Sequence, residues 1–104
     1  MVRFLVLYTT PKDIEAFERH YHEVHIPLAK KLAGLRRYTL SHNVAPIRGG
    51  KPYYLIAELD WDSMDDLKKA FQSPEGQATA EDVDILEKLS PGVYSMIYEL
   101  EEMV

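Results

Sequence analysis

Four short stretches of the chain, at 3–9, 35–42, 53–61 and 93–101, combine apolar residues with strand-forming types. Such runs, bounded by turn residues, are typical of β-strands. Between the first two stretches and between the last two, apolar residues recur every three or four positions, which is typical of helices that bury one face. The pattern therefore predicts the order strand, helix, strand, strand, helix, strand.

This order is the split βαβ arrangement of ferredoxin-like proteins. It predicts an α+β fold, βαββαβ, in which a four-stranded antiparallel sheet carries both helical regions on one face. No linker, repeat or low-complexity segment divides the 104 residues, and this length is typical of one domain. We therefore expect a single domain over residues 1–104.

The two helical regions have recognisable apolar stripes. The first is expected to bury Ile14, Phe17, Tyr21, Val24 and Leu28. Pro27 lacks an amide proton and disfavours helical geometry in the residue before it, so this helix is expected to kink or pause near His25. The second region begins after a cap at Ser63 and is interrupted around Pro74. Its later part is expected to bury Ala80, Val83, Leu86 and Leu89.

Alternation places apolar residues on both faces of the expected sheet. In the first strand Phe4, Val6 and Tyr8 share one face, and Leu5 and Leu7 share the other. Alternation does not say which face meets the helices, but helices can cover only one, and a large uncovered apolar face is rare in monomers. We therefore predict a homodimer through the open sheet face, with an aromatic cavity beside the sheet. The alternative is that these are scattered surface residues.

The composition excludes several classes of function. The chain has no cysteine, which excludes disulfides, thiolate metal sites and cysteine nucleophiles. Its 12 Lys and Arg against 17 Asp and Glu give a formal net charge of −5, and an acidic chain without a basic stripe is a poor partner for nucleic acid. No apolar run is long enough to cross a bilayer and no signal-peptide pattern is found, so we expect no membrane partner and a cytoplasmic location.

Three histidines, His20, His22 and His25, lie in the first helical region. On a helical wheel His25 and His20 fall at the two edges of the apolar stripe, and His22 falls on the polar side. The ring of His25 could therefore reach a cavity, where its pKa near neutrality would suit proton transfer. The alternative is a hydrogen-bonded structural histidine. His22 and His25 lack further ligands at the right spacing, so we predict no metal site.

Seven tyrosines are a second chemical resource of the chain. A buried tyrosine hydroxyl needs a hydrogen-bond partner, and it can donate to a carbonyl or phenolate oxygen of a small ligand. Tyr21 and Tyr38 are our candidates for orienting a substrate. The candidates for further ligand contacts are Phe4, Tyr8, His22, Tyr54 and Tyr98. The alternative interpretation for most of these side chains is bulky core packing.

Three segments of the sequence resemble a known family. The stretch 17–29 reads Phe-Glu-Arg-His-Tyr-His-Glu-Val-His-Ile-Pro-Leu-Ala, and Gly-Leu-Arg-Arg-Tyr follows at 34–38. Ser-Pro-Glu-Gly-Gln then occupies 73–77, with Asp82 after it. With these segments the chain resembles the EthD-like family of the dimeric α+β barrel superfamily over nearly its whole length. Ala33 stands where the family usually has proline, which is expected to alter a turn and leave the chemistry unchanged.

The resemblance implies a ferredoxin-like subunit, a homodimer and a role for His25 as the family's recurring histidine. The superfamily is similar to metal-free isomerases, cyclases and oxygenases of small cyclic or aromatic compounds. Our hypothesis is a cofactor-independent acid–base enzyme of the isomerase, lyase or oxygenase type, acting on a small hydrophobic, phenolic or lactone compound. His25 would abstract or relay a proton, and Tyr21 and Tyr38 would orient the substrate or stabilise an oxyanion.

Two alternatives remain open at this point. The first is a binding protein that sequesters or delivers a small hydrophobic compound without changing it. The second is a heme-handling protein, a role that relatives with this barrel perform, in which His25 would be the axial ligand. The fold alone fixes no substrate.

Overall fold

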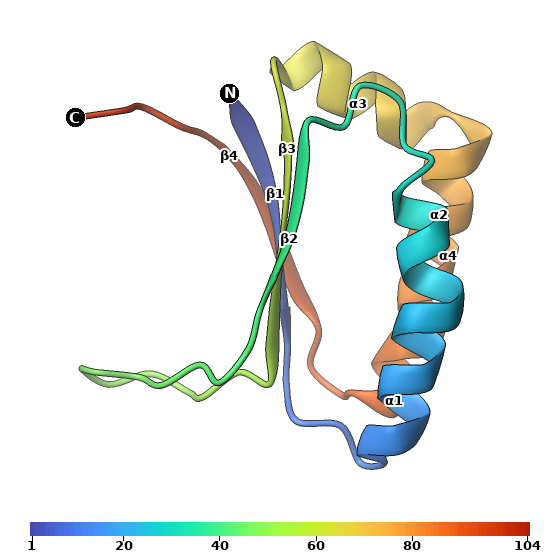
Figure 1. Cartoon of the computed structure of the whole chain (residues 1–104), viewed down its shortest axis with the longest axis vertical. Coiled ribbons are helices and arrows are strands. Elements are labelled where there is room, and N and C mark those ends of the chain that lie inside the picture. The colour runs from blue at the N-terminus through green and yellow to red at the C-terminus, as the bar shows by residue number, and fades with distance from the viewer.

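The computed structural model describes residues 1–104 and has one antiparallel sheet with every helix on the same side (Figure 1). Its elements are β1 (Val2–Tyr8), α1 (Ile14–His20), the π-helix η1 (Tyr21–His25), α2 (Ile26–Ala29), β2 (Arg37–Ser41), β3 (Leu55–Trp61), α3 (Met64–Gln72), α4 (Pro74–Leu89) and β4 (Tyr94–Glu99). The strand order is β2-β3-β1-β4. The predicted α+β, ferredoxin-like fold is confirmed. None of the helices has the length and apolar character that a membrane crossing requires.

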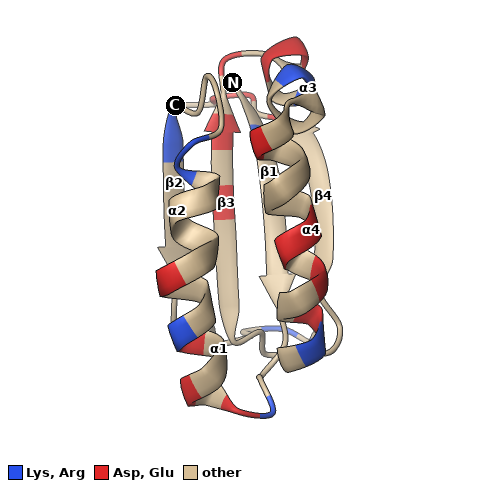
Figure 2. Cartoon of the chain, turned by 90° about the vertical axis from the view of Figure 1, so that its right-hand side faces the viewer, with Lys and Arg blue, Asp and Glu red and all other residues tan.

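Two helical rods lie side by side over the sheet (Figure 2). The first is formed by α1, η1 and α2, and the second by α4, whose axis turns away from that of the shorter α3 at Ser73 (Figure 1). Each rod begins with a side-chain cap: Asp13 accepts a hydrogen bond from the amide of Ala16, and Ser73 accepts one from the amide of Gly76. The core therefore fills the space between one face of the sheet and these two rods.

The first rod is irregular near His25, where the sequence predicted a kink or pause, but the helix does not break there. The turn just before Pro27 widens into η1, where the amide of Ile26 donates to the carbonyl of Tyr21 five residues earlier. In such a wide turn, residues four apart stay on one face. Tyr21 and His25 are therefore both buried, whereas Val24 is 39% exposed. The prediction that Val24 belongs to the core was wrong, and His25 takes that place.

The second rod is also rotated relative to the sequence prediction. Gly76 lies against α3, where an added Cβ would stand 2.1 Å from the carbonyl oxygen of Ala70. This close approach of backbones fixes which face of α4 turns inward. Leu86 is buried on that face, as predicted, and Asp82 is buried beside it, whereas Ala80, which was expected in the core, is exposed. The rotation brings a carboxylate into the interior.

The helix-covered face of the sheet carries Phe4, Val6 and Tyr8, which the alternating pattern of the first strand placed on one face. Val6 pairs with Ala57 across β1 and β3, and both are buried. At one end of this face Trp61 is fully buried, and its indole N–H donates to the carbonyl of Ala33, 2.9 Å away. The next residue, Gly34, has a φ of +73°, which favours glycine. This hydrogen bond connects β3 to the turn that follows α2.

The opposite face of the sheet is open to solvent in the single chain. The register places Leu5 beside Met96, and Met96 is 49% exposed. The other end of this face is charged, because Arg3 pairs with Glu58 at 2.7 Å and with Asp60 at 2.8 Å. The β2–β3 connection and the C-terminal tail both extend away from the helices on this open side (Figure 1). The open face is therefore apolar in its centre and flanked by two projecting segments.

Candidate functional site

A cavity of about 250 Å³ lies between the sheet and the helices. Ten of its 13 lining residues are hydrophobic, and none is Asp, Glu, Lys or Arg. The polar groups in its wall belong to Tyr8, Tyr21, His25, Thr79 and Ser95. A cavity of about 150 Å³ can hold benzene, so this one has room for a substituted ring. Its lining favours a neutral and mostly apolar guest.

His25 is held in the cavity wall by a carboxylate on the opposite rod. Its Nδ1 lies 2.9 Å from Oδ2 of Asp82, and both side chains are nearly inaccessible to solvent. An ionised carboxylate can only accept hydrogen bonds, so Nδ1–H donates. The Nε2 atom is then the unprotonated nitrogen, and no group of the chain is bonded to it. The arrangement therefore offers a basic nitrogen in an apolar cavity.

The environment keeps His25 neutral near neutral pH. Burial lowers the pKa of His25 below its usual 6.5, and the hydrogen bond to Asp82 opposes that effect only in part. A neutral imidazole with an oriented tautomer is the form that a general base requires. A neutral His25 is able to accept a proton, and the neighbouring Asp82 carboxylate would stabilise the imidazolium formed in that case.

Asp82 is the functional candidate that sequence reasoning did not select. It appeared only within the family resemblance, because the apolar stripe of its helix was placed on another face. Its second oxygen, Oδ1, lies 2.7 Å from Nε2 of His20. A pattern with Gly76, Thr79, Asp82 and Leu86 on one helical face was available in the sequence and could have identified it. One buried carboxylate therefore serves two histidines.

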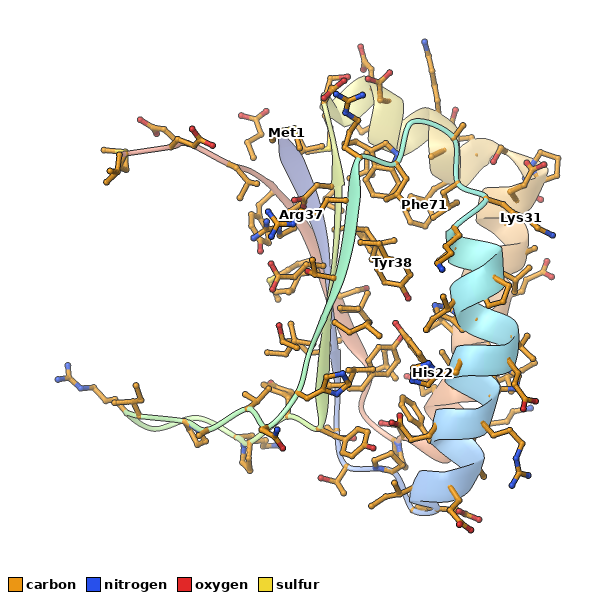
Figure 3. All side chains as sticks on the ribbon, viewed as in Figure 1. Met1, His22, Lys31, Arg37, Tyr38 and Phe71 are labelled. Atoms are coloured by element: carbon orange, nitrogen blue, oxygen red, sulfur yellow. The ribbon has the colours of Figure 1, made fainter.

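Three tyrosines form a second polar group beside His25. The hydroxyls of Tyr21 and Tyr38 are hydrogen-bonded at 2.6 Å, and Figure 3 shows Tyr38 pointing from β2 toward the helices. The hydroxyl of Tyr8 is fully buried and has no partner. Burial raises the pKa of Tyr38 to about 12 and raises the pKa values of Tyr8 and Tyr21 further. All three are therefore neutral phenols that can donate hydrogen bonds to a ligand or to one another.

The structure separates the sequence-selected candidates into two sets. Phe4 lines the cavity with Tyr8, Tyr21 and His25, and its ring packs 4.9 Å from that of Phe71. Tyr38 lies behind Tyr21 and acts on the cavity only through their hydrogen bond.

The second set lies away from this cavity. The ring of Tyr54 packs edge-on against Phe17 at 5.8 Å and borders a separate polar hollow. His22 is exposed on the first rod, and Tyr98 lies opposite Arg3 on the open face of the sheet. The geometry also contains no cluster of three or more His, Asp or Glu side chains that could hold a metal ion.

The fold is that of a ferredoxin-like α+β protein with a largely apolar cavity between its sheet and its helices. A family model described as "EthD domain" matches residues 10–86. The chain is 32% identical, over 100% of its length and 98% of the relative's, to an uncharacterised 11.0 kDa protein in the thcB–thcC intergenic region of Rhodococcus erythropolis. An EthD family protein of Bacillus halodurans is 33% identical with a TM-score of 0.84, covering 97% of this chain and 99% of that one. The chain belongs to the EthD family.

More distant solved structures share the fold. A dimeric protein of unknown function with a ferredoxin-like fold from Bacteroides fragilis has a TM-score of 0.64 at 21% identity, over 95% of both chains. SnoaB, a cofactor-independent oxygenase from Streptomyces nogalater, has a TM-score of 0.68 at 18% identity, over 99% of this chain and 95% of its own. At these identities the likeness concerns the fold alone.

Proposed function

We propose that the protein is a cofactor-independent acid–base enzyme acting on a small, neutral, largely apolar compound that carries a carbonyl or phenolic oxygen. The observation that carries this proposal is the pair formed by His25 and the buried Asp82 in the wall of an apolar cavity. A buried, charge-paired titratable group in a cavity is a marker of functional sites. The reaction class is of the isomerase, lyase or oxygenase type.

The geometry supports a division of roles. His25 accepts a proton from the compound at Nε2, while Asp82 holds Nδ1–H and stabilises the resulting imidazolium. The hydroxyl of Tyr8, which lacks a partner in the chain, donates to the oxygen on which negative charge develops. Tyr21 is fixed by its bond to Tyr38 and closes this side of the cavity. In an isomerisation the imidazolium returns its proton to another atom of the same compound.

The proposal includes a homodimer formed through the open sheet face. Tyr94 and Met96 leave about half of their surfaces exposed on this face, although they are large and apolar. The two segments that project on this side, the β2–β3 connection and the tail, would lie beside a second sheet (Figure 1). The dimeric Bacteroides relative has the same fold. A second copy is therefore the partner that suits this face.

The second candidate function is ligand binding without chemistry. Ten hydrophobic lining residues are sufficient to hold a small apolar compound even if His25 never exchanges a proton. The two functions differ in what removal of the imidazole does. Binding without chemistry predicts that the wild type binds such compounds saturably without turnover, and that a His25 variant changes only the ligand affinity and the stability.

The test is a screen of small lactones, enols and phenols for turnover, followed by the His25→Gln variant. We expect loss of at least about 10²-fold in rate with the correctly folded variant, the usual size for a positioned acid–base group. His42→Gln is the matched control, because His42 is exposed and does not line this cavity. Full activity in folded His25→Gln would remove His25 from the mechanism. Saturable binding without turnover in the wild type would support the binding protein instead.

A further inference from the structure

Asp82 is shared between two imidazoles that differ in their access to solvent. Its Oδ2 lies 2.9 Å from Nδ1 of His25, and its Oδ1 lies 2.7 Å from Nε2 of His20. The side chains of Asp82 and His25 are 5% and 7% exposed, whereas that of His20 is 21% exposed. The cluster therefore connects an inner histidine in the cavity wall to an outer histidine in contact with water.

One carboxylate can balance only one positive imidazole at full strength. When His20 is protonated, the charge of Asp82 is already compensated, and a second positive charge on His25 meets repulsion as well as burial. When His20 is neutral, the whole charge of Asp82 is available to His25. Protonation of the two rings is therefore antagonistic, and their titrations belong to the pair.

We propose that His20 is a positioning residue that acts through Asp82 and controls when His25 accepts a proton. This inference rests on the proposed function, because it assigns a purpose to the basicity of His25. His20 does not line the cavity. Its influence reaches His25 through the shared carboxylate and through the charge of its own ring.

When His20 carries a proton, the cluster consists of one imidazolium, one carboxylate and one neutral ring. His25 then takes a proton from the bound compound at Nε2, and His20 releases one to water through its exposed side. The net charge of the cluster is the same before and after this exchange.

No other charged group faces His25 from the surrounding elements. From β1 and β2 it meets the neutral phenol of Tyr8 and, behind Tyr21, that of Tyr38. The strand β4 contributes only Ser95 to the cavity. The charges that act on His25 are those of Asp82 and His20. This isolation makes the effect of His20 measurable.

The test is an NMR pH titration of the protein with ¹⁵N-labelled histidine and no ligand. In the wild type, the ring signals of His20 and His25 are expected to show two-step curves, each responding to the titration of the other. In His20→Gln, the proton affinity of His25 is expected to rise about tenfold, the size of a charge interaction at the edge of a protein interior. In an Asp82→Asn background, His20→Gln is expected to raise the proton affinity of His25 by clearly less than in the wild-type background, because only the direct charge interaction between the two rings remains.

Arg19→Gln is the matched control. It removes a positive charge from the neighbouring exposed residue, which has no ion pair with Asp82. A general electrostatic effect would shift the pKa of His25 by the same amount in Arg19→Gln and in His20→Gln. That result would overturn the proposal. So would single-step, independent titration of the two rings in the wild type, a measurement that needs no variant to fold. Because the titration uses no substrate, it tests the coupling of His20 and His25 even if the proposed enzyme activity is not found.

Discussion

Asp82 lies 2.9 Å from His25, although the two residues are 57 positions apart and belong to different helical rods. The contact needs both the wide turn η1, which turns His25 inward, and the rotation of α4 at Gly76, which turns Asp82 inward. It gives the cavity a basic nitrogen with a fixed tautomer. The function proposed for the chain depends on this pair.

Asp82→Asn is the most direct change to the pair. An amide has one acceptor and one donor face, so it cannot accept hydrogen bonds from both histidines as the carboxylate does. One ring must change its tautomer, and the imidazolium of His25 loses its counter-charge. We expect activity on the panel to fall by about 10²-fold or more. Retention of wild-type activity in the folded variant would show that the carboxylate has no role.

The pKa of His25, lowered by burial, makes a prediction about stability and pH. The unfolded chain binds the His25 proton at a higher pH than the folded chain does. This contribution to stability is therefore complete above about pH 6.5 and is lost as the pH falls through the folded pKa, by up to about 1.4 kcal/mol per pH unit. Urea unfolding of wild type and His25→Gln at several pH values measures it. A wild type that gains stability over the variant on acidification would mean that His25 is charged when folded.

Tyr8→Phe separates a ligand-binding hydroxyl from a structural one. The Tyr8 hydroxyl is buried without a partner, which costs free energy in the unliganded protein. Its removal should leave the free energy of unfolding unchanged or raise it by about 1 kcal/mol, while weakening ligand binding or turnover at least tenfold. Tyr21→Phe, which breaks the 2.6 Å bond to Tyr38, should instead reduce stability. A destabilised Tyr8→Phe with unchanged ligand affinity would contradict the assignment.

Placing a charged side chain on the open face of the sheet tests whether that face forms the homodimer interface. We expect light scattering to give about twice the chain mass of 12.0 kDa, and Met96→Asp to give a monomer, because a charge would be buried in the interface. Ile85→Asp is the control, since Ile85 is similarly exposed on the helical side. Phe4 is unsuitable as a probe because it points into the cavity. A wild-type monomer at micromolar concentration would exclude the interface.

The alternating strands could be predicted from the sequence because their signal is local. Phe4, Val6 and Tyr8 share a face whatever the rest of the chain does. The order of the elements then restricts the topology to one that the structure confirms. The placement of His25 at an edge of the helical stripe came close to its true position for a similar reason.

The cluster around Asp82 could not be predicted in this way because its causes are tertiary. An ideal helical wheel places Val24 in the core and cannot anticipate that η1 replaces it with His25. The rotation of α4 depends on a contact between Gly76 and Ala70 that periodicity does not encode. Gly76, Thr79, Asp82 and Leu86 share a helical face that can be found in the sequence, but a carboxylate on an otherwise acidic helix gives no local reason to choose that face over the more apolar one.

A titration of the ¹⁵N-histidine-labelled protein with phenol shows whether the cavity beside His25 binds such compounds. We expect a saturable shift of the Nε2 signal of His25, with His42 unaffected, and a weaker affinity in Tyr8→Phe. A His25 signal that does not respond to phenol or to any lactone or enol of the panel, in a folded protein, would mean that this cavity is not a site for such compounds.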